Sequence, residues 1–121
     1  MLIVDDGQNH ADFLALRLQA HGAEVQCAYT QRDGLELMAC WRPDVALVDI
    51  GIPDISGYDV AELIRAGSDG GQVLLVAVTG FSDPSVEEKA REAGFDDRLL
   101  KPLDFEKLST LIARHIESRD G

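Results

Sequence analysis

Residues 73–80 have the sequence VLLVAVTG, an uninterrupted apolar run that stops at a threonine and a glycine. A strand with one face in water alternates apolar and polar side chains, whereas a strand covered on both faces is apolar throughout. The run therefore predicts a central strand, Val73 to Val78, in a parallel sheet with helices on both faces.

Short apolar or β-branched runs alternate with segments of helical period on both sides of this strand. We expect the other strands at Leu2–Val4, Ala23–Ala28, Val45–Val48 and Asp97–Leu100. Five strands alternating with five helices predict an α/β fold, a doubly wound, flavodoxin-like five-stranded parallel sheet in the order 2-1-3-4-5.

Apolar side chains at helical spacing mark the expected buried faces of the helices. They are Ala11, Leu14 and Leu18; Leu35, Met38 and Trp41; Val60, Leu63 and Ile64; and Phe105, Leu108, Leu111 and Ile112. Thr30 and Asp83 are the expected N-caps of the second and fourth helices. Gly22 and Gly94 should end the first and fourth helices, and the Gly67–Gly71 cluster the third. The last helix should end near Ser118.

Length, composition and charge limit the class of protein. The 121 residues, 45% of them hydrophobic, suit one core, so we expect one domain over residues 1–121. The net charge of −11 argues against direct binding of nucleic acid, which needs a basic surface. No apolar run approaches the roughly 20 residues of a membrane span. Cys27 and Cys40 fit reduced thiols better than a disulfide framework, so we expect a cytoplasmic protein without membrane insertion.

Polar side chains follow four of the expected strands, at the edge where open α/β sheets bind ligands. Asp5 and Asp6 follow the first strand, Asp49 the third, Thr79 the fourth and Lys101 the fifth. The strand order reverses between the first and third strands, so the three aspartates should converge there. Like charges about 4 Å apart repel by roughly 4 kcal/mol at an effective dielectric of 20, so the cluster calls for a cation or a raised pKa.

The donor set at this edge indicates which cation and which substrate it would hold. Carboxylate oxygens, a backbone carbonyl and water suit Mg²⁺, whereas zinc prefers nitrogen and sulfur. The Lys101 ammonium and the Thr79 hydroxyl are groups that can hold phosphoryl oxygens beside a metal. Together these groups predict an aspartate that accepts phosphate.

The same residues give essentially the whole chain a resemblance to a known family. The motifs are Val4-Asp5-Asp6, Pro43-Asp44 leading to Asp49-Ile50-Gly51-Ile52-Pro53, Ser56-Gly57-Tyr58, Thr79-Gly80, Ala93-Gly94-Phe95-Asp96-Asp97 and Lys101-Pro102. In this order they resemble the receiver domains of two-component response regulators and hybrid histidine kinases. The segment from Val76 to Leu103 is most similar to receivers fused to hybrid sensor kinases.

The resemblance implies a phosphorelay function in which the domain catalyses its own phosphorylation and dephosphorylation without being a conventional enzyme. Asp49 would accept a phosphoryl group from the phosphohistidine of a histidine kinase or phosphotransfer domain. Asp6, Asp49 and the backbone carbonyl of Gly51 would ligate Mg²⁺ directly, and Asp5 largely through a metal-bound water. The phosphorylated domain would then regulate an output domain or effector that the sequence does not name.

The resemblance also implies roles on the other side of the acceptor. Lys101 would contact first the acceptor and then the phosphoryl group, and the Lys101–Pro102 bond would be cis. The Thr79 hydroxyl would bind a phosphoryl oxygen after transfer and so trigger the switch.

Two positions depart from the family pattern. Gly7 stands where an acidic or amide residue is common, and Arg98 where receivers commonly carry Tyr, Phe or His. A guanidinium that enters an apolar slot loses the hydration of its charge. We therefore expect Arg98 to stay outward and exposed, unless a buried carboxylate pairs with it, and the response to phosphorylation to be smaller or differently routed.

Three other functions compete with a phosphorylated switch. A receiver fold could serve as an unphosphorylated docking module. A haloacid-dehalogenase-type hydrolase needs a D-x-D nucleophile motif on the first strand, where this chain has adjacent aspartates. A flavodoxin-like electron carrier needs a Ser/Thr/Gly-rich phosphate loop, which the first turn lacks. Because one residue precedes the first strand and no effector follows the last helix, we expect either a single-domain receiver or part of a longer protein.

Overall fold

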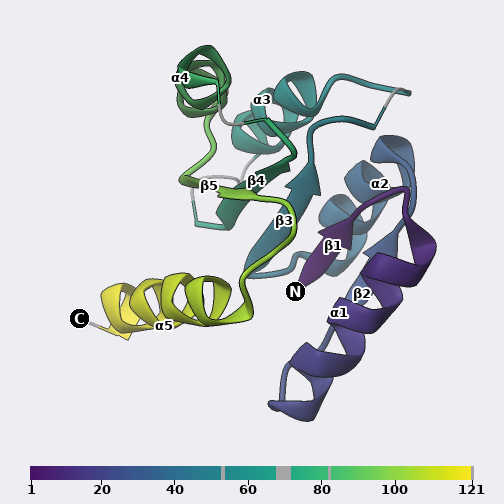
Figure 1. The fold of residues 1–121 in the computed structure, drawn as a ribbon, viewed down its shortest axis with the longest axis vertical. Helices are drawn as coiled ribbons and strands as arrows, with labels where there is room; N and C mark the ends of the chain where they lie inside the picture. Colours follow the sequence, from purple (N-terminus) through teal and green to yellow (C-terminus); the bar gives the residue numbers. More distant parts are fainter. Residues whose placement is uncertain (53, 68–71, 82, 121) are drawn as a thin grey trace.

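Five short strands form one parallel sheet in the computed structural model of the chain (Figure 1). The strands are β1 (Leu2–Val4), β2 (Gln26–Ala28), β3 (Val45–Asp49), β4 (Leu74–Thr79) and β5 (Asp97–Leu100). Their order is β2-β1-β3-β4-β5 and every neighbouring pair is parallel, which confirms the predicted fold.

The structure describes residues 1–52, 54–67, 72–81 and 83–120, and only the backbone of residues 117–120. Pro53, the last residue of one motif, and residues 68–71, at the expected end of the third helix, therefore lie outside the described residues. A helix follows each strand: α1 (Gln8–Ala20), α2 (Gln31–Trp41), α3 (Gly57–Ala66), α4 (Pro84–Ala93) and α5 (Phe105–Asp120).

The sheet separates two hydrophobic layers. Alternate side chains of β4 point to opposite faces, so Leu75 and Ala77 join one layer while Leu74 and Val76 join the other. The first layer lies under α2, α3 and α4, and the second under α1 and α5. Every residue of β3 and β4 is buried, as the apolar run of the central strand predicted.

The predicted starts of α2 and α4 and the predicted glycines after α1 and α4 are confirmed. The Thr30 hydroxyl accepts a hydrogen bond from the Asp33 amide at 3.1 Å, and the Asp83 carboxylate accepts one from the Ser85 amide at 2.9 Å. Gly22 (φ 93°) follows α1 and Gly94 (φ 112°) follows α4, both in the left-handed region. The backbone therefore enters and leaves these helices where the sequence indicates.

Three boundaries differ from the sequence prediction. β2 begins at Gln26 rather than Ala23, because β1, beside it at the edge of the sheet, offers three residues for pairing. Val73 is buried but lies outside β4, which includes Thr79 instead. The last helix runs to Asp120, beyond the expected end near Ser118.

The buried face of α3 also differs from the prediction. Leu63 is 58% exposed, because the face toward the sheet consists of Gly57, Val60, Ala61 and Ile64, to one side of Leu63. Gly57 is the first residue of α3. A Cβ at Gly57 would lie 2.6 Å from the Cα of Ile50, so α3 packs directly on the segment after Asp49.

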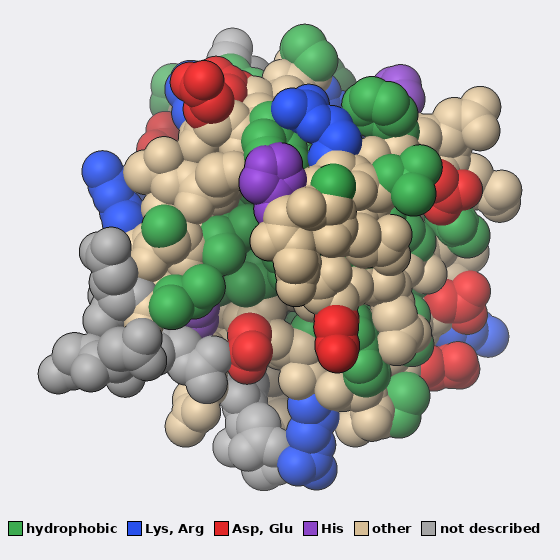
Figure 2. Space-filling model, turned by 90° about the horizontal axis from the view of Figure 1, so that it is seen from below, with side chains coloured by type: hydrophobic (Ala, Val, Ile, Leu, Met, Phe, Trp, Pro, Cys, Tyr) green, Lys and Arg blue, Asp and Glu red, His purple; other side chains and the backbone are tan. Residues whose placement is uncertain are grey.

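Charges of both signs are spread over the surface seen in Figure 2, where Lys and Arg lie among Asp and Glu rather than in one basic patch. Among the described residues, no helix has both the length and the apolar character needed to cross a bilayer.

Candidate functional site

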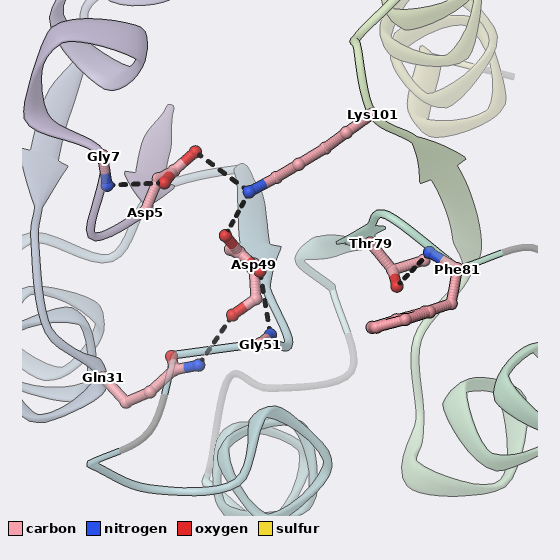
Figure 3. A network of polar contacts seen from close by, with 8 residues as sticks. All are labelled: Asp5, Gly7, Gln31, Asp49, Gly51, Thr79, Phe81 and Lys101. Carbon is pink, nitrogen blue, oxygen red and sulfur yellow. Dashed lines mark hydrogen bonds and ion pairs between the residues drawn. The ribbon is translucent and has the colours of Figure 1, made fainter.

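The polar residues at the strand ends meet at the carboxyl edge of the sheet (Figure 3). Asp5 and Asp6 directly follow β1, and Asp49 is the last residue of β3. One carboxylate oxygen from each of these three aspartates lies within 4.8 Å of the others. The predicted convergence of the aspartates is therefore confirmed, and three hard oxygen donors at this spacing fit a cation such as Mg²⁺.

Lys101 reaches across from the end of β5 into this cluster (Figure 3). Its Nζ lies 2.5 Å from Asp49 Oδ2 and 3.9 Å from Asp5 Oδ2. Burial alone would lower the pKa of Lys101, but the hydrogen bond to Asp49 and the charges of Asp49, Asp5 and Asp6 outweigh it and raise that pKa. Lys101 is therefore a permanent cation at neutral pH, and its predicted contact with Asp49 is present.

Backbone amides fix the second oxygen of two of the carboxylates. Asp49 Oδ1 accepts a hydrogen bond from the Gly51 amide at 2.8 Å, and Asp5 Oδ1 accepts one from the Gly7 amide at 2.8 Å. Both carboxylates thus keep one oxygen on a backbone donor and turn the other toward Lys101. These bonds fix the Asp49 and Asp5 carboxylates, and Asp6, the third member of the cluster, is exposed.

Thr79 ends β4 beside this cluster and is 2% exposed. Its hydroxyl oxygen accepts a hydrogen bond from the Phe81 amide at 3.1 Å, so it is bound to its own loop (Figure 3). A hydroxyl that accepts one bond still has its own proton to donate.

The Lys101–Pro102 bond that follows β5 is cis, as predicted.

Arg98 does not lie fully outward as expected. Its side chain is 19% exposed, its Nη1 donates to the Phe81 carbonyl at 3.3 Å, and its Nη2 lies 3.5 Å from Glu87 Oε2 on α4. The carboxylate that pairs with it is 59% exposed rather than buried. Arg98 therefore lies against α4 with its charge balanced at the surface, an arrangement that avoids full desolvation.

Sequence reasoning missed one site residue, Gln31. Its side chain is 0% exposed, and its Nε2 donates to the backbone carbonyl of Asp49 at 2.9 Å (Figure 3). A polar residue in the first turn of a helix usually faces solvent, so the sequence carried no signal for this contact beyond its place next to the Thr30 cap.

The family model of the response regulator receiver domain matches residues 1–113 of the chain. The chain belongs to this receiver family. The receiver is 30% identical to the regulatory protein AtoC of Escherichia coli over 97% of its length and 25% of AtoC. It is 32% identical to the transcriptional regulatory protein CusR of the same species over 89% of its length and 47% of CusR. The chain thus spans between a quarter and half of these relatives.

Solved receiver structures share the fold. The BeF₃-activated DrrB receiver domain is 29% identical and has a TM-score of 0.84, covering 96% of this receiver and 95% of that chain. Chemotaxis response regulator CheY4 of Vibrio cholerae is 25% identical with a TM-score of 0.86, covering 94% and 95%. A two-component response regulator from Clostridium difficile, 22% identical with a TM-score of 0.91 and covering 99% and 97%, supports the fold alone.

Family membership confirms the predicted class of function, a receiver in two-component phosphorelay signalling, and does not favour the docking-module alternative. Receiver domains interact with histidine kinases and output domains. They also bind Mg²⁺ at an acidic pocket, and the Asp5, Asp6 and Asp49 cluster has the donors for such a pocket.

Proposed function

We propose that Asp49 accepts the phosphoryl group, taking it from the phosphohistidine of a histidine kinase or a phosphotransfer domain. The observation that supports this choice is the 2.5 Å contact between Asp49 Oδ2 and Lys101 Nζ. Asp49 is also the buried member of the cluster, at 6% exposure, and it ends β3, which lies between β1, followed by Asp5, and β4, which ends at Thr79. The nearby cationic, carboxylate and hydroxyl groups support Asp49 as the acceptor.

The transfer exchanges one bond to phosphorus for another. An Asp49 carboxylate oxygen forms the new P–O bond as the P–N bond to the imidazole breaks, and the bonding pair leaves with the imidazole nitrogen. Asp5, Asp6, Asp49 and the Gly51 carbonyl would hold Mg²⁺, which supplies positive charge against the phosphoryl oxygens when bound.

The remaining side chains act on the charge that the phosphoryl group brings. Lys101 moves from the Asp49 carboxylate to a phosphoryl oxygen, because formation of the acyl phosphate removes the carboxylate charge it was paired with. The Thr79 hydroxyl donates its proton to another phosphoryl oxygen. The same groups serve hydrolysis of the acyl phosphate, so the domain assists both its phosphorylation and its dephosphorylation.

The proposed unit is the whole of residues 1–121, acting in the cytoplasm on an output domain or effector protein. The net charge of −11 supports a protein partner rather than direct contact with nucleic acid.

The acceptor can be tested by intact mass after treatment with acetyl phosphate and Mg²⁺. We expect wild type to gain one phosphoryl group and Asp49→Ala to gain none. Asp59→Ala is the matched control, because Asp59 is an exposed aspartate in the first turn of α3, and it should label like wild type. Equal labelling of Asp49→Ala and wild type would overturn the assignment, and an unlabelled wild type would favour the docking module.

A further inference from the structure

The described residues include three polar or charged side chains that are buried: Asp49, Thr79 and Gln31. The first two belong to the proposed phosphorylation site. Gln31, at 0% exposure, is the most buried of the three and has no role in that proposal. A buried amide is costly unless its polar atoms are paired, so its contacts call for an explanation.

Gln31 binds the backbone of the proposed acceptor. Its Nε2 donates to the carbonyl oxygen of Asp49 at 2.9 Å. The pairing between β1 and β3 ends at Val4 and Val48, one residue before this carbonyl. The Gln31 side chain thus supplies a hydrogen-bond donor to β3 at Asp49, one residue beyond the last pair with β1.

The same turn of α2 also holds the far end of the segment after Asp49. The backbone amides of Gln31 and Arg32 donate to Asp54 Oδ1 and Oδ2 at 3.1 and 3.2 Å. The segment that contains Gly51 is therefore bound to α2 at Asp49 and again at Asp54. Gly51 in turn donates its amide to the Asp49 carboxylate at 2.8 Å.

The start of α2 is a firm support for these contacts. A Cβ on Gly34 would lie 2.7 Å from Val4 Cγ2, so the helix backbone lies directly against β1. The Thr30 hydroxyl caps the same turn at 3.1 Å. Movement of Gln31 relative to the sheet would therefore require the displacement of packed backbone.

We propose that Gln31 is a positioning residue, which holds the Asp49 main chain so that the Asp49 carboxylate and the Gly51 carbonyl face the Mg²⁺ site. The inference rests on the proposed function. Gln31 Oε1 is buried and has no hydrogen-bond partner among the described residues. An unpaired buried oxygen costs stability, and an apolar side chain of the same size would not carry that cost. We therefore attribute the glutamine at this position to its hydrogen bond with the Asp49 carbonyl rather than to the stability of the fold.

The test compares wild type with Gln31→Met, which keeps the length of the side chain and removes its donor. We expect Mg²⁺ affinity, measured by calorimetry, to fall about tenfold, as is typical when a partner that orients a ligand is lost. Labelling by acetyl phosphate should need correspondingly more Mg²⁺. In the metal-free protein, the NMR amide signals of Ile50 and Gly51 should shift, while the melting temperature stays close to that of wild type.

Leu108→Ala is the matched control, because Leu108 is fully buried in the layer under α1 and α5. It should lower the melting temperature and leave Mg²⁺ affinity unchanged. Gln31→Glu is the second variant: its carboxylate cannot donate when ionised, so it should also bind Mg²⁺ more weakly.

Wild-type Mg²⁺ affinity in both Gln31 variants would overturn the proposal. So would a loss of affinity that Leu108→Ala reproduces, because the effect would then follow from stability alone. If wild type binds Mg²⁺ but takes up no phosphoryl group, the proposed acceptor chemistry fails, while the Mg²⁺ affinities of the variants still decide the role of Gln31.

Discussion

At the scale of single residues, a hydrogen bond to a carboxylate raises the pKa of Tyr29. The Tyr29 hydroxyl donates to Asp12 Oδ1 at 2.6 Å and so joins the end of β2 to α1. This hydrogen bond, with smaller contributions from burial and from the charge of Asp12, raises the pKa of Tyr29 to about 12. The ordinary value is about 10, so the folded protein keeps a proton that the unfolded chain loses between these values.

We predict that replacing Asp12 by Asn lowers the pKa of Tyr29 toward 10, because the charged acceptor is lost. The absorbance of the phenolate at 295 nm reports this directly in a Tyr58→Phe background, since Tyr29 and Tyr58 are the two tyrosines of the chain. An unchanged titration midpoint in Asp12→Asn would contradict the assignment.

The sign of the stability effect follows from the raised pKa. Stabilisation by the Tyr29 hydrogen bond is complete below about pH 10 and is lost as the pH rises toward 12. The difference in unfolding free energy between wild type and Tyr29→Phe should therefore shrink over this range.

At the scale of elements, Phe81 and Arg98 together connect the end of β4 to α4. Phe81 donates its amide to the Thr79 hydroxyl, and its carbonyl accepts from Arg98, whose other nitrogen lies 3.5 Å from Glu87 on α4. If Thr79 moves toward a phosphoryl group as proposed, it displaces Phe81, whose carbonyl accepts the Arg98 hydrogen bond. The chain thus has a polar connection from Phe81 through Arg98 to Glu87 on α4.

We predict that Arg98→Ala leaves phosphorylation of Asp49 intact and reduces the NMR shift changes of α4 amides when beryllofluoride binds. The cause is the loss of two contacts, one to the Phe81 carbonyl after β4 and one to Glu87 on α4. The fold should lose no more than about 1 kcal/mol, as expected for an ion pair at the surface.

Glu87→Gln should reproduce part of this effect, because it removes the charge that Arg98 meets. Glu88→Gln alters a neighbouring exposed acid and serves as the control. If α4 responds to beryllofluoride equally in wild type and Arg98→Ala, the polar connection does not carry the change.

At the scale of the whole molecule, the net charge is −11, and the three aspartates of the acidic cluster are part of it. We predict that Mg²⁺ raises the melting temperature by mass action, with about 2.7 kcal/mol of stabilisation at a hundredfold excess over the dissociation constant. Scanning calorimetry at constant ionic strength separates binding from general screening, because NaCl screens charge without filling the site.

In Asp6→Asn and Asp49→Asn, the melting temperature should rise no more with Mg²⁺ than with NaCl at the same ionic strength. An equal rise with NaCl in wild type would mean that the stabilisation is screening and that the cluster is not a metal site.

The sequence could predict those features that depend on local pattern. The burial of β4 and the convergence of Asp5, Asp6 and Asp49 follow from strand periodicity and strand order. The exposure of Leu63 and the burial of Gln31 depend instead on where neighbouring helices contact the sheet, which no local pattern records. The hydration cost of the Arg98 charge predicts a position in solvent, but the sequence pattern does not record that the exposed carboxylate of Glu87 lies within reach.

The division of the core by the sheet has a consequence for how substitutions combine. Val60 is buried on one face and Leu108 on the other, with the strands between them. Changes at distant sites without shared partners usually have additive effects, within about 0.5 kcal/mol. The two layers can therefore accumulate substitutions almost independently. Epistasis between the layers should concentrate at the carboxyl edge of the sheet, where residues from both sides meet around Asp49.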